Sequence, residues 1–279
     1  MNDNENKCLA HYNLSYDISA IRPFINWLYF LHAWGLSGKP QEEKDKMKAE
    51  AERMLDSLEG RYHTRALFSL FVANSDGDDI IVGDTRFPML RQQHPSENGG
   101  PNLSLADFIR PAASGIEDRL GVFATTVDSA LEHDFLADDF QRMLAQTLAD
   151  RLAEATTEVL HRDVRRRYWG YAPDEQLSVR EMLREDFQGI RPAVGYPSLP
   201  DTSANFIIDR LLSLGQIGIR LTESGAMKPH ASVSGLMFAH PKAHYFDLGK
   251  IGDDQLHDYA RRRGLPVELV RRFLAVRLQ

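Results

Sequence analysis

The sequence predicts an α+β fold with an antiparallel sheet, and three observations support this class. Short apolar runs bounded by turn residues predict strands, and several of these runs come in hairpin-like pairs. Longer segments with apolar residues at three-and-four spacing predict helices, and they stand in separate runs instead of alternating with single strands. The 279 residues show neither an internal repeat nor a strong linker. We therefore expect a flexible segment at 1–9 and a single domain at 10–279.

The first part of the chain should contribute two helices and a pair of strands. Residues 17–34 carry apolar side chains at helical spacing, which predicts one buried helical face. Residues 41–62 are rich in Glu, Lys, Ala and Met, with sparse apolar residues on one side, and predict a surface helix. Two strands are expected at 66–73 and 78–82, joined by the turn at 74–77.

The middle of the chain should contribute a loop, a central strand and a long helix. Residues 92–101 have the composition of a loop, and residues 120–126 are typical of a central strand. From residue 138 the apolar positions repeat at helical spacing as far as Tyr168, enough for about seven turns. Ser178 is a candidate cap for the next helix.

The last part of the chain mixes strands and helices. A helix is expected at 202–214, followed by strands near 217–221, 232–238 and 245–248. Two terminal helices should follow, separated by Gly264-Leu-Pro266, because Gly ends a helix and Pro begins one.

Composition excludes several classes of function. With 33 basic against 40 acidic residues the net charge is −7, which argues against sequence-independent binding to nucleic acid. The single Cys8 cannot form an internal disulfide and fits a reducing cytoplasm. The densest apolar stretch, residues 24–34, is too short to span a bilayer, so we expect no membrane association.

The candidate motifs for metal binding and for conventional cofactor binding lack residues that these sites require. The acidic turn that begins at Asn74 has Asp79 and Thr85 where a calcium loop needs Gly and Glu. A Pro lies between His240 and His244, which makes a helical metal site doubtful, and we expect no metal. The glycine-rich turn of a Rossmann fold is missing from the sequence.

The most informative run is Arg191-Pro-Ala-Val-Gly-Tyr196. A guanidinium on backbone constrained by Pro and Gly can bond both oxygens of a carboxylate. Taken alone, Arg191 would more often form a structural ion pair, and Tyr196 and Tyr245 would more often be core or rim aromatics. Glu154 lies off the apolar stripe of its helix, where a solvated side chain is the commoner outcome.

The stretch 186–197 resembles the S-adenosylmethionine-binding reactivation, or activation, domain at the C-terminus of cobalamin (vitamin B12)-dependent methionine synthase. Agreement extends in order along nearly the whole chain. The further blocks are Ala73-Asn-Ser75, Gly77-Asp-Asp-Ile80, Leu105-Ala-Asp-Phe108, Ala149-Asp-Arg-Leu-Ala-Glu154, Tyr168-Trp-Gly-Tyr-Ala-Pro173, Leu221-Thr-Glu-Ser224 and Asp258-Tyr-Ala-Arg-Arg262. The resemblance implies a single C-shaped α+β domain with a central twisted antiparallel sheet flanked by helices.

The resemblance also implies a binding site for S-adenosylmethionine. The residues that match it are Asn26, Glu154, Arg191, Pro192, Ala193, Tyr196, Tyr245 and Phe246. Arg191 is implied to hold the ligand carboxylate, and the other charges of the ligand call for carboxylate or carbonyl acceptors and aromatic surface. Asn26 stands where the family usually has Asp, and the missing negative charge should weaken binding of a cation by about 1 kcal/mol.

The resemblance implies a role in methionine biosynthesis, as the module that presents the methyl donor for reductive methylation of cob(II)alamin. It implies a cobalamin-binding partner domain, in cis or in trans, and a flavodoxin-like electron donor. We expect no catalytic side chain in this chain and no activity of the chain alone. Asn26, Phe246 and the absence of a cobalamin motif favour an alternative, a non-catalytic S-adenosylmethionine-binding or regulatory protein. An ordinary methyltransferase acting alone is disfavoured by the missing glycine-rich turn.

Overall fold

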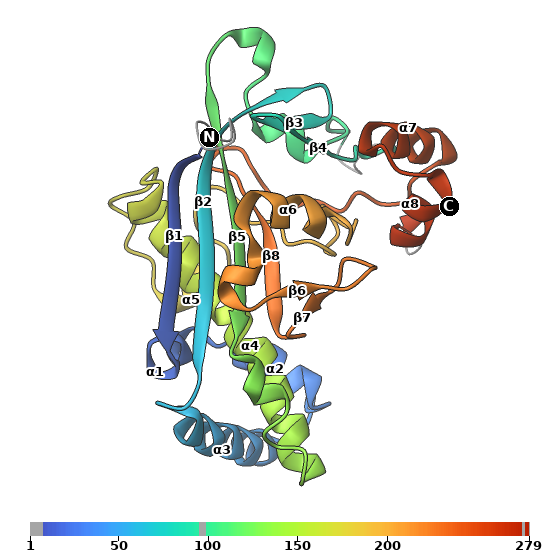
Figure 1. The fold of residues 1–279 in the computed structure, drawn as a ribbon. Helices are drawn as coiled ribbons and strands as arrows, with labels where there is room; N and C mark the ends of the chain where they lie inside the picture. The colour runs from blue at the N-terminus through green and yellow to red at the C-terminus, as the bar shows by residue number, and fades with distance from the viewer. Residues whose placement is uncertain (1–7, 95–98, 275–276, 279) are drawn as a thin grey trace.

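An antiparallel sheet lies at the centre of the molecule (Figure 1). The computed structural model describes residues 8–94, 99–274 and 277–278. The long strands of the sheet are β1 (Cys8–Asp17), β2 (His63–Asp76), β5 (Asp118–Val127) and β8 (Ser232–Met237). They lie side by side in the order β1-β2-β5-β8, and every neighbouring pair is antiparallel. The predicted α+β class with an antiparallel sheet flanked by helices is confirmed, and β5 is an interior strand as expected.

The far end of β2 continues into a smaller hairpin. β3 (Asp79–Val82) pairs with β2, with Asp76 opposite Asp79 across the turn, and β4 (Thr85–Pro88) pairs with β3. Gly77 has φ +58° in this turn, a backbone conformation that glycine adopts without steric cost. The two strands expected on either side of the turn are confirmed, whereas the four-residue β4 was not predicted.

The single helix expected over 17–34 is wrong, because the chain breaks there into two short helices. α1 (Ile18–Ile21) passes into a 3₁₀ turn that contains Pro23, and Ile25 is extended at φ −63° and ψ 126°. Asn26 then caps α2 (Trp27–Ala33). Pro stops the first helix since it has no N–H to donate, and Asn begins the next since its side chain accepts the free N–H groups.

Two helices confirm their predictions. α3 (Gln41–Leu58) is polar outside and buries Ala51, Leu55 and Leu58. α4 (Asp139–Asp163) lies across one face of the sheet and ends in a π-helical turn at Val164–Tyr168. α4 packs against the sheet, and α3 packs against α4 and α2.

Alternate residues of β5 face opposite layers, as the period of a strand requires. Phe123 packs in a cluster with Leu160 on the α4 side. Val122 and Ala124 pack in another cluster with residues of α6 (Ala204–Leu212) on the opposite face. Two apolar layers therefore cover the two faces of the sheet, and a further apolar cluster lies around the C-terminal helices.

Ser178 caps a helix as predicted, but α5 (Val179–Met182) has only one turn. The strand expected near 217–221 shrinks to β6 (Arg220–Leu221), which pairs with β7 (Met227–Lys228). The strand expected at 245–248 is wrong, because these residues have no regular structure.

The chain ends in two helices, as predicted. α7 (Asp253–Arg263) stops at Gly264, which has φ +66°, and α8 (Val267–Phe273) begins after Pro266. At the other end, the expected flexible segment lies outside the described residues except for its last two members, Cys8 and Leu9, which begin β1. Within the described ranges, none of the helices is both long and apolar enough to cross a bilayer.

Candidate ligand-binding site

The segment that carries Arg191 is held on the free edge of β8. Ile190 and Phe238 exchange backbone hydrogen bonds of 3.0 and 2.9 Å. Further along, the Val194 N–H donates to the Ser234 carbonyl at 2.9 Å. Backbone pairing on both sides of Arg191 therefore fixes where its side chain begins.

Glycine permits this close approach. A Cβ at Gly235 would lie 2.2 Å from the Pro192 carbonyl oxygen and 2.9 Å from the Cα of Ala193, closer than real Cβ atoms come. A Cβ at Gly189 would lie 2.3 Å from the Phe238 carbonyl oxygen. Both glycines thus serve the placement of the Arg191 segment.

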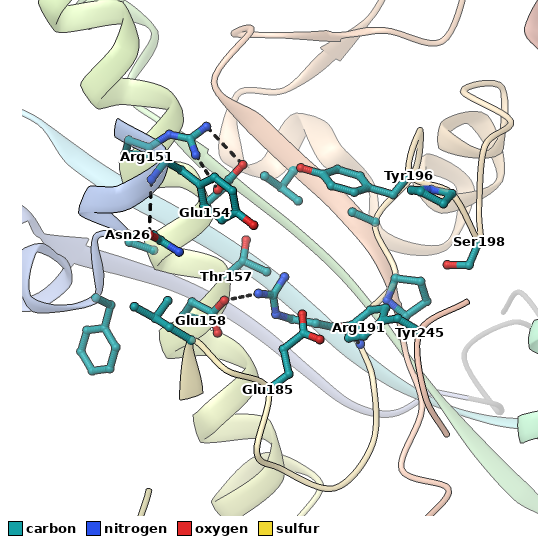
Figure 2. A pocket seen from close by; sticks show the side chains of 18 of the residues that line it. Asn26, Arg151, Glu154, Thr157, Glu158, Glu185, Arg191, Tyr196, Ser198 and Tyr245 are labelled. Carbon is teal, nitrogen blue, oxygen red and sulfur yellow. Dashed lines mark hydrogen bonds and ion pairs between the residues drawn. The ribbon is translucent and has the colours of Figure 1, made fainter. Parts of the chain in front are cut away.

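A cavity of about 700 Å³ opens beside this segment, between α4, the start of α2 and the irregular segment at 245–247 (Figure 2). All eight residues that the sequence singled out line it, namely Asn26, Glu154, Arg191, Pro192, Ala193, Tyr196, Tyr245 and Phe246. Its volume is in the range of cavities that hold small molecules and cofactors. The structure therefore brings into one place residues that are up to 220 positions apart in the chain, from Asn26 to Phe246.

Arg191 reaches across the cavity to α4. Its Nη2 and Oε1 of Glu158 form a close hydrogen-bonded ion pair, and the side chains are 18% and 11% exposed. Burial opposes the positive charge of Arg191, but the Glu158 carboxylate together with Tyr245 and Glu185 outweighs it and raises the Arg191 pKa. Nε of Arg191 and Oε2 of Glu158 are both buried and have no hydrogen-bond partner among the described residues. Glu158 therefore orients the guanidinium and leaves part of its donor set unused.

Glu154 lies one turn before Glu158 on the same helix and is paired differently. Its carboxylate accepts hydrogen bonds of 2.9 and 3.3 Å from the two terminal nitrogens of Arg151. Burial raises the pKa of Glu154, while Arg151 acts in the opposite direction. The ring of Tyr196 stands nearby with 54% of the residue exposed, and burial together with the Glu154 charge raises the pKa of its phenol.

Asn26 has a structural task besides lining the cavity. Its Oδ1 accepts the backbone N–H groups of Leu28 and Tyr29 at 3.2 and 3.4 Å, so it caps α2. An Asp at this position could accept the same bonds.

Tyr245 connects the irregular segment to the Arg191 backbone. The Arg191 N–H donates to the Tyr245 hydroxyl at 3.0 Å. Burial raises the pKa of this phenol. This bond joins the irregular segment to the cavity wall beside Arg191.

Four charged residues of the cavity, Arg151, Glu158, Glu185 and Asp247, were not predicted. Glu158 follows Glu154 by four positions, so the helical period alone could have placed the two on one face of α4. For Glu185 the sequence carries no such signal. Across the described ranges, no group of three His, Cys, Asp or Glu side chains is placed to hold a metal ion.

Fold and site together define a class: an antiparallel α+β domain whose cavity suits a small molecule with a carboxylate and positive charge. Residues 17–264 match the family model described as "Vitamin B12 dependent methionine synthase, activation domain". The crystal structure of the MetH reactivation domain bound to AdoHcy is similar to this chain, with a TM-score of 0.91 and 40% identity over 97% of this chain and 90% of that chain. The chain belongs to the family of vitamin B12-dependent methionine synthase activation domains.

Proposed function

We propose that this domain binds S-adenosylmethionine in the cavity and presents its methyl group for the reductive methylation of cob(II)alamin. The observation that carries the proposal is the largely buried Arg191 guanidinium, fixed by β8 and Glu158 and lining a cavity of about 700 Å³ with further carboxylates and aromatic rings. S-adenosylmethionine offers a carboxylate to such a guanidinium and positive charge to such carboxylates.

Each part of the cavity has a separate task in this proposal. Arg191 binds the ligand carboxylate, and the Pro192–Ala193 backbone and the Tyr196 ring line the space beside it. Glu154 and the rings of Tyr245 and Phe246 complete the walls. S-adenosylmethionine supplies a methyl group that leaves a neutral thioether when reduced cobalt attacks it. The chain itself therefore supplies binding and orientation, and needs no acid or base of its own.

The remaining chemistry comes from partners. Membership of the family implies cobalamin-binding partner domains, in cis or in trans. We further propose that a flavodoxin-like protein donates the electron that reduces cob(II)alamin. The single Cys8, which cannot form an internal disulfide, supports a cytoplasmic location for this system.

An alternative proposal is a non-catalytic S-adenosylmethionine-binding or regulatory protein. Asn26 favours it, because a neutral amide lines the cavity where the family pattern has a carboxylate. In that case ligand binding would persist without methyl transfer to cobalamin.

Calorimetric titration with S-adenosylmethionine tests the proposed ligand. Arg191→Ala should weaken binding by at least about tenfold, because a charge-assisted hydrogen bond to a buried guanidinium contributes about 1.5–3 kcal/mol. Arg184→Ala is the matched control, since Arg184 is exposed, pairs with Asp186 and lies outside the cavity wall. Absence of binding by the wild-type protein would contradict the proposal.

A further inference from the structure

Among the described residues, the acidic side chains that line the cavity are paired with arginines, with the exception of Glu185. The ion pairs are Glu154–Arg151, Glu158–Arg191 and Asp247–Arg277. Glu185 also lines the cavity, and its carboxylate makes neither a hydrogen bond nor an ion pair with any residue that the structure describes. No described residue therefore neutralises the negative charge of Glu185 by direct contact.

Glu185 is also open to a ligand, unlike the free oxygen of Glu158. Oε2 of Glu158 is shielded from solvent as well as unpartnered, so a ligand could reach it only after rearrangement. Glu185 is an exposed residue whose side chain points into the cavity beside Arg191 (Figure 2). Partial burial raises the pKa of Glu185, while the charge of Arg191 acts in the opposite direction. The two carboxylates thus differ in role: Glu158 orients Arg191, and Glu185 faces the space that a ligand would fill.

The backbone holds Glu185 in place. Its φ is +62°, and within the described ranges only one other non-glycine residue, Ser213, has a positive φ. The Glu185 N–H donates to the Met182 carbonyl at 2.9 Å at the end of α5. Left-handed backbone at a residue with a long side chain costs free energy and is concentrated at functional sites.

The position beside Arg191 determines which ligand group Glu185 would meet. In an α-amino acid the ammonium nitrogen lies about 2.5 Å from the carboxylate carbon. A carboxylate bound to Arg191 therefore brings the ammonium group close to the guanidinium, where like charges repel unless an acceptor is near. Among the carboxylates around Arg191, Glu185 is accessible and unpaired.

We propose that Glu185 binds the α-ammonium group of the ligand and makes the cavity specific for an intact α-amino acid head. This inference rests on the proposed function, since it takes the ligand carboxylate to be bound by Arg191. Glu185 is a specificity-determining residue in this account and takes no part in the transfer of the methyl group.

Titration of the whole chain with three ligands tests the inference: S-adenosylmethionine, S-adenosylhomocysteine and a deaminated analogue of S-adenosylhomocysteine. Glu185→Gln should weaken the first two alike, by about tenfold, because both carry the ammonium group. The affinity for the deaminated analogue should stay unchanged. Glu158→Gln should weaken all three, because it releases Arg191, and Glu223→Gln, at an exposed residue outside the cavity wall, should change none.

Other outcomes would overturn the inference, or the inference together with the proposed function. Loss confined to S-adenosylmethionine would mean that Glu185 faces the sulfonium, and equal loss for all three ligands would mean a merely structural role; either result overturns the inference. Unchanged binding by Glu185→Gln would overturn it while leaving the proposed function intact. Wild-type protein that binds none of the ligands would remove both. Thermal unfolding of each variant checks that it is folded, and Gln has the same backbone preferences as Glu.

Discussion

At the scale of single residues, ligand binding in the cavity depends on which partner orients or neutralises each charged side chain. Arg191 is oriented by Glu158, and Glu154 is neutralised by Arg151. A guanidinium that is already fixed loses less conformational entropy when it binds a carboxylate. The specificity of the site therefore resides in paired residues and, among the described residues that line the cavity, in the unpaired Glu185 carboxylate.

Asn26→Asp offers a test at this scale. Asp can accept the same N–H groups that Asn26 accepts from Leu28 and Tyr29, so the cap of α2 should survive. The added negative charge lines the cavity and should tighten S-adenosylmethionine binding by about fivefold to tenfold, from about 1 kcal/mol of attraction. S-adenosylhomocysteine, which lacks the sulfonium charge, should gain less. Competitive titration of the two ligands measures the difference, and equal gains would contradict the expected charge effect.

At the scale of elements, the contact between β8 and the Arg191 segment determines the shape of the site. Gly235→Ala should push the Pro192 carbonyl away, since the new Cβ would lie 2.2 Å from its oxygen. We expect a loss of S-adenosylmethionine affinity of about tenfold or more together with about 1–3 kcal/mol of destabilisation. Gly215→Ala is the control, because nothing lies within 4 Å of its Cβ position. Wild-type affinity in a folded Gly235→Ala protein would refute this positioning role.

The secondary-structure elements differ in how well the sequence predicts them. The 25 residues of α4 were predicted well because a long periodic pattern is unambiguous. β1 was missed although Ala10, Tyr12, Leu14 and Tyr16 alternate with polar residues, which is the period of a half-buried strand. The irregular backbone around Tyr245 depends on a hydrogen bond to Arg191 that is 54 positions away in sequence.

The site residues were predicted from a family resemblance, whereas the helices and strands were predicted from local sequence patterns. The structure places the eight predicted site residues around one cavity. Glu185 acquires its position from tertiary packing, because the loop after α5 and the Arg191 segment must both lie beside α4 to form the cavity. No local pattern of residues carries that information.

At the scale of the whole molecule, a buried histidine should make stability depend on pH. His161 is fully buried in α4, and burial together with Arg165 and Arg191 lowers its pKa well below the ordinary value. It is therefore neutral in the folded protein, whereas the unfolded chain takes up a proton below about pH 6.5. The contribution of His161 is present above that pH and is lost as the pH falls, by up to about 1.4 kcal/mol per pH unit.

Urea unfolding at about pH 7 and about pH 5.5 measures this effect. His161→Gln should show a smaller decrease in the free energy of unfolding between the two conditions, by about 1 kcal/mol. His133→Gln, at an exposed position, is the control. Identical pH dependence in the wild-type protein and His161→Gln would contradict the assignment.

The central claim concerns the molecule and its partner together. Its most direct test is to mix this protein with a cobalamin-binding domain, a reductant and S-adenosylmethionine labelled in its methyl group, and to measure label on the cobalamin. The account predicts labelled cobalamin with the wild-type protein, far less with Arg191→Ala, and none when the cobalamin-binding domain is left out. Ligand binding without any transfer of label would contradict the account and favour a regulatory protein, and label transferred to another acceptor without cobalamin would mean a methyltransferase that acts alone.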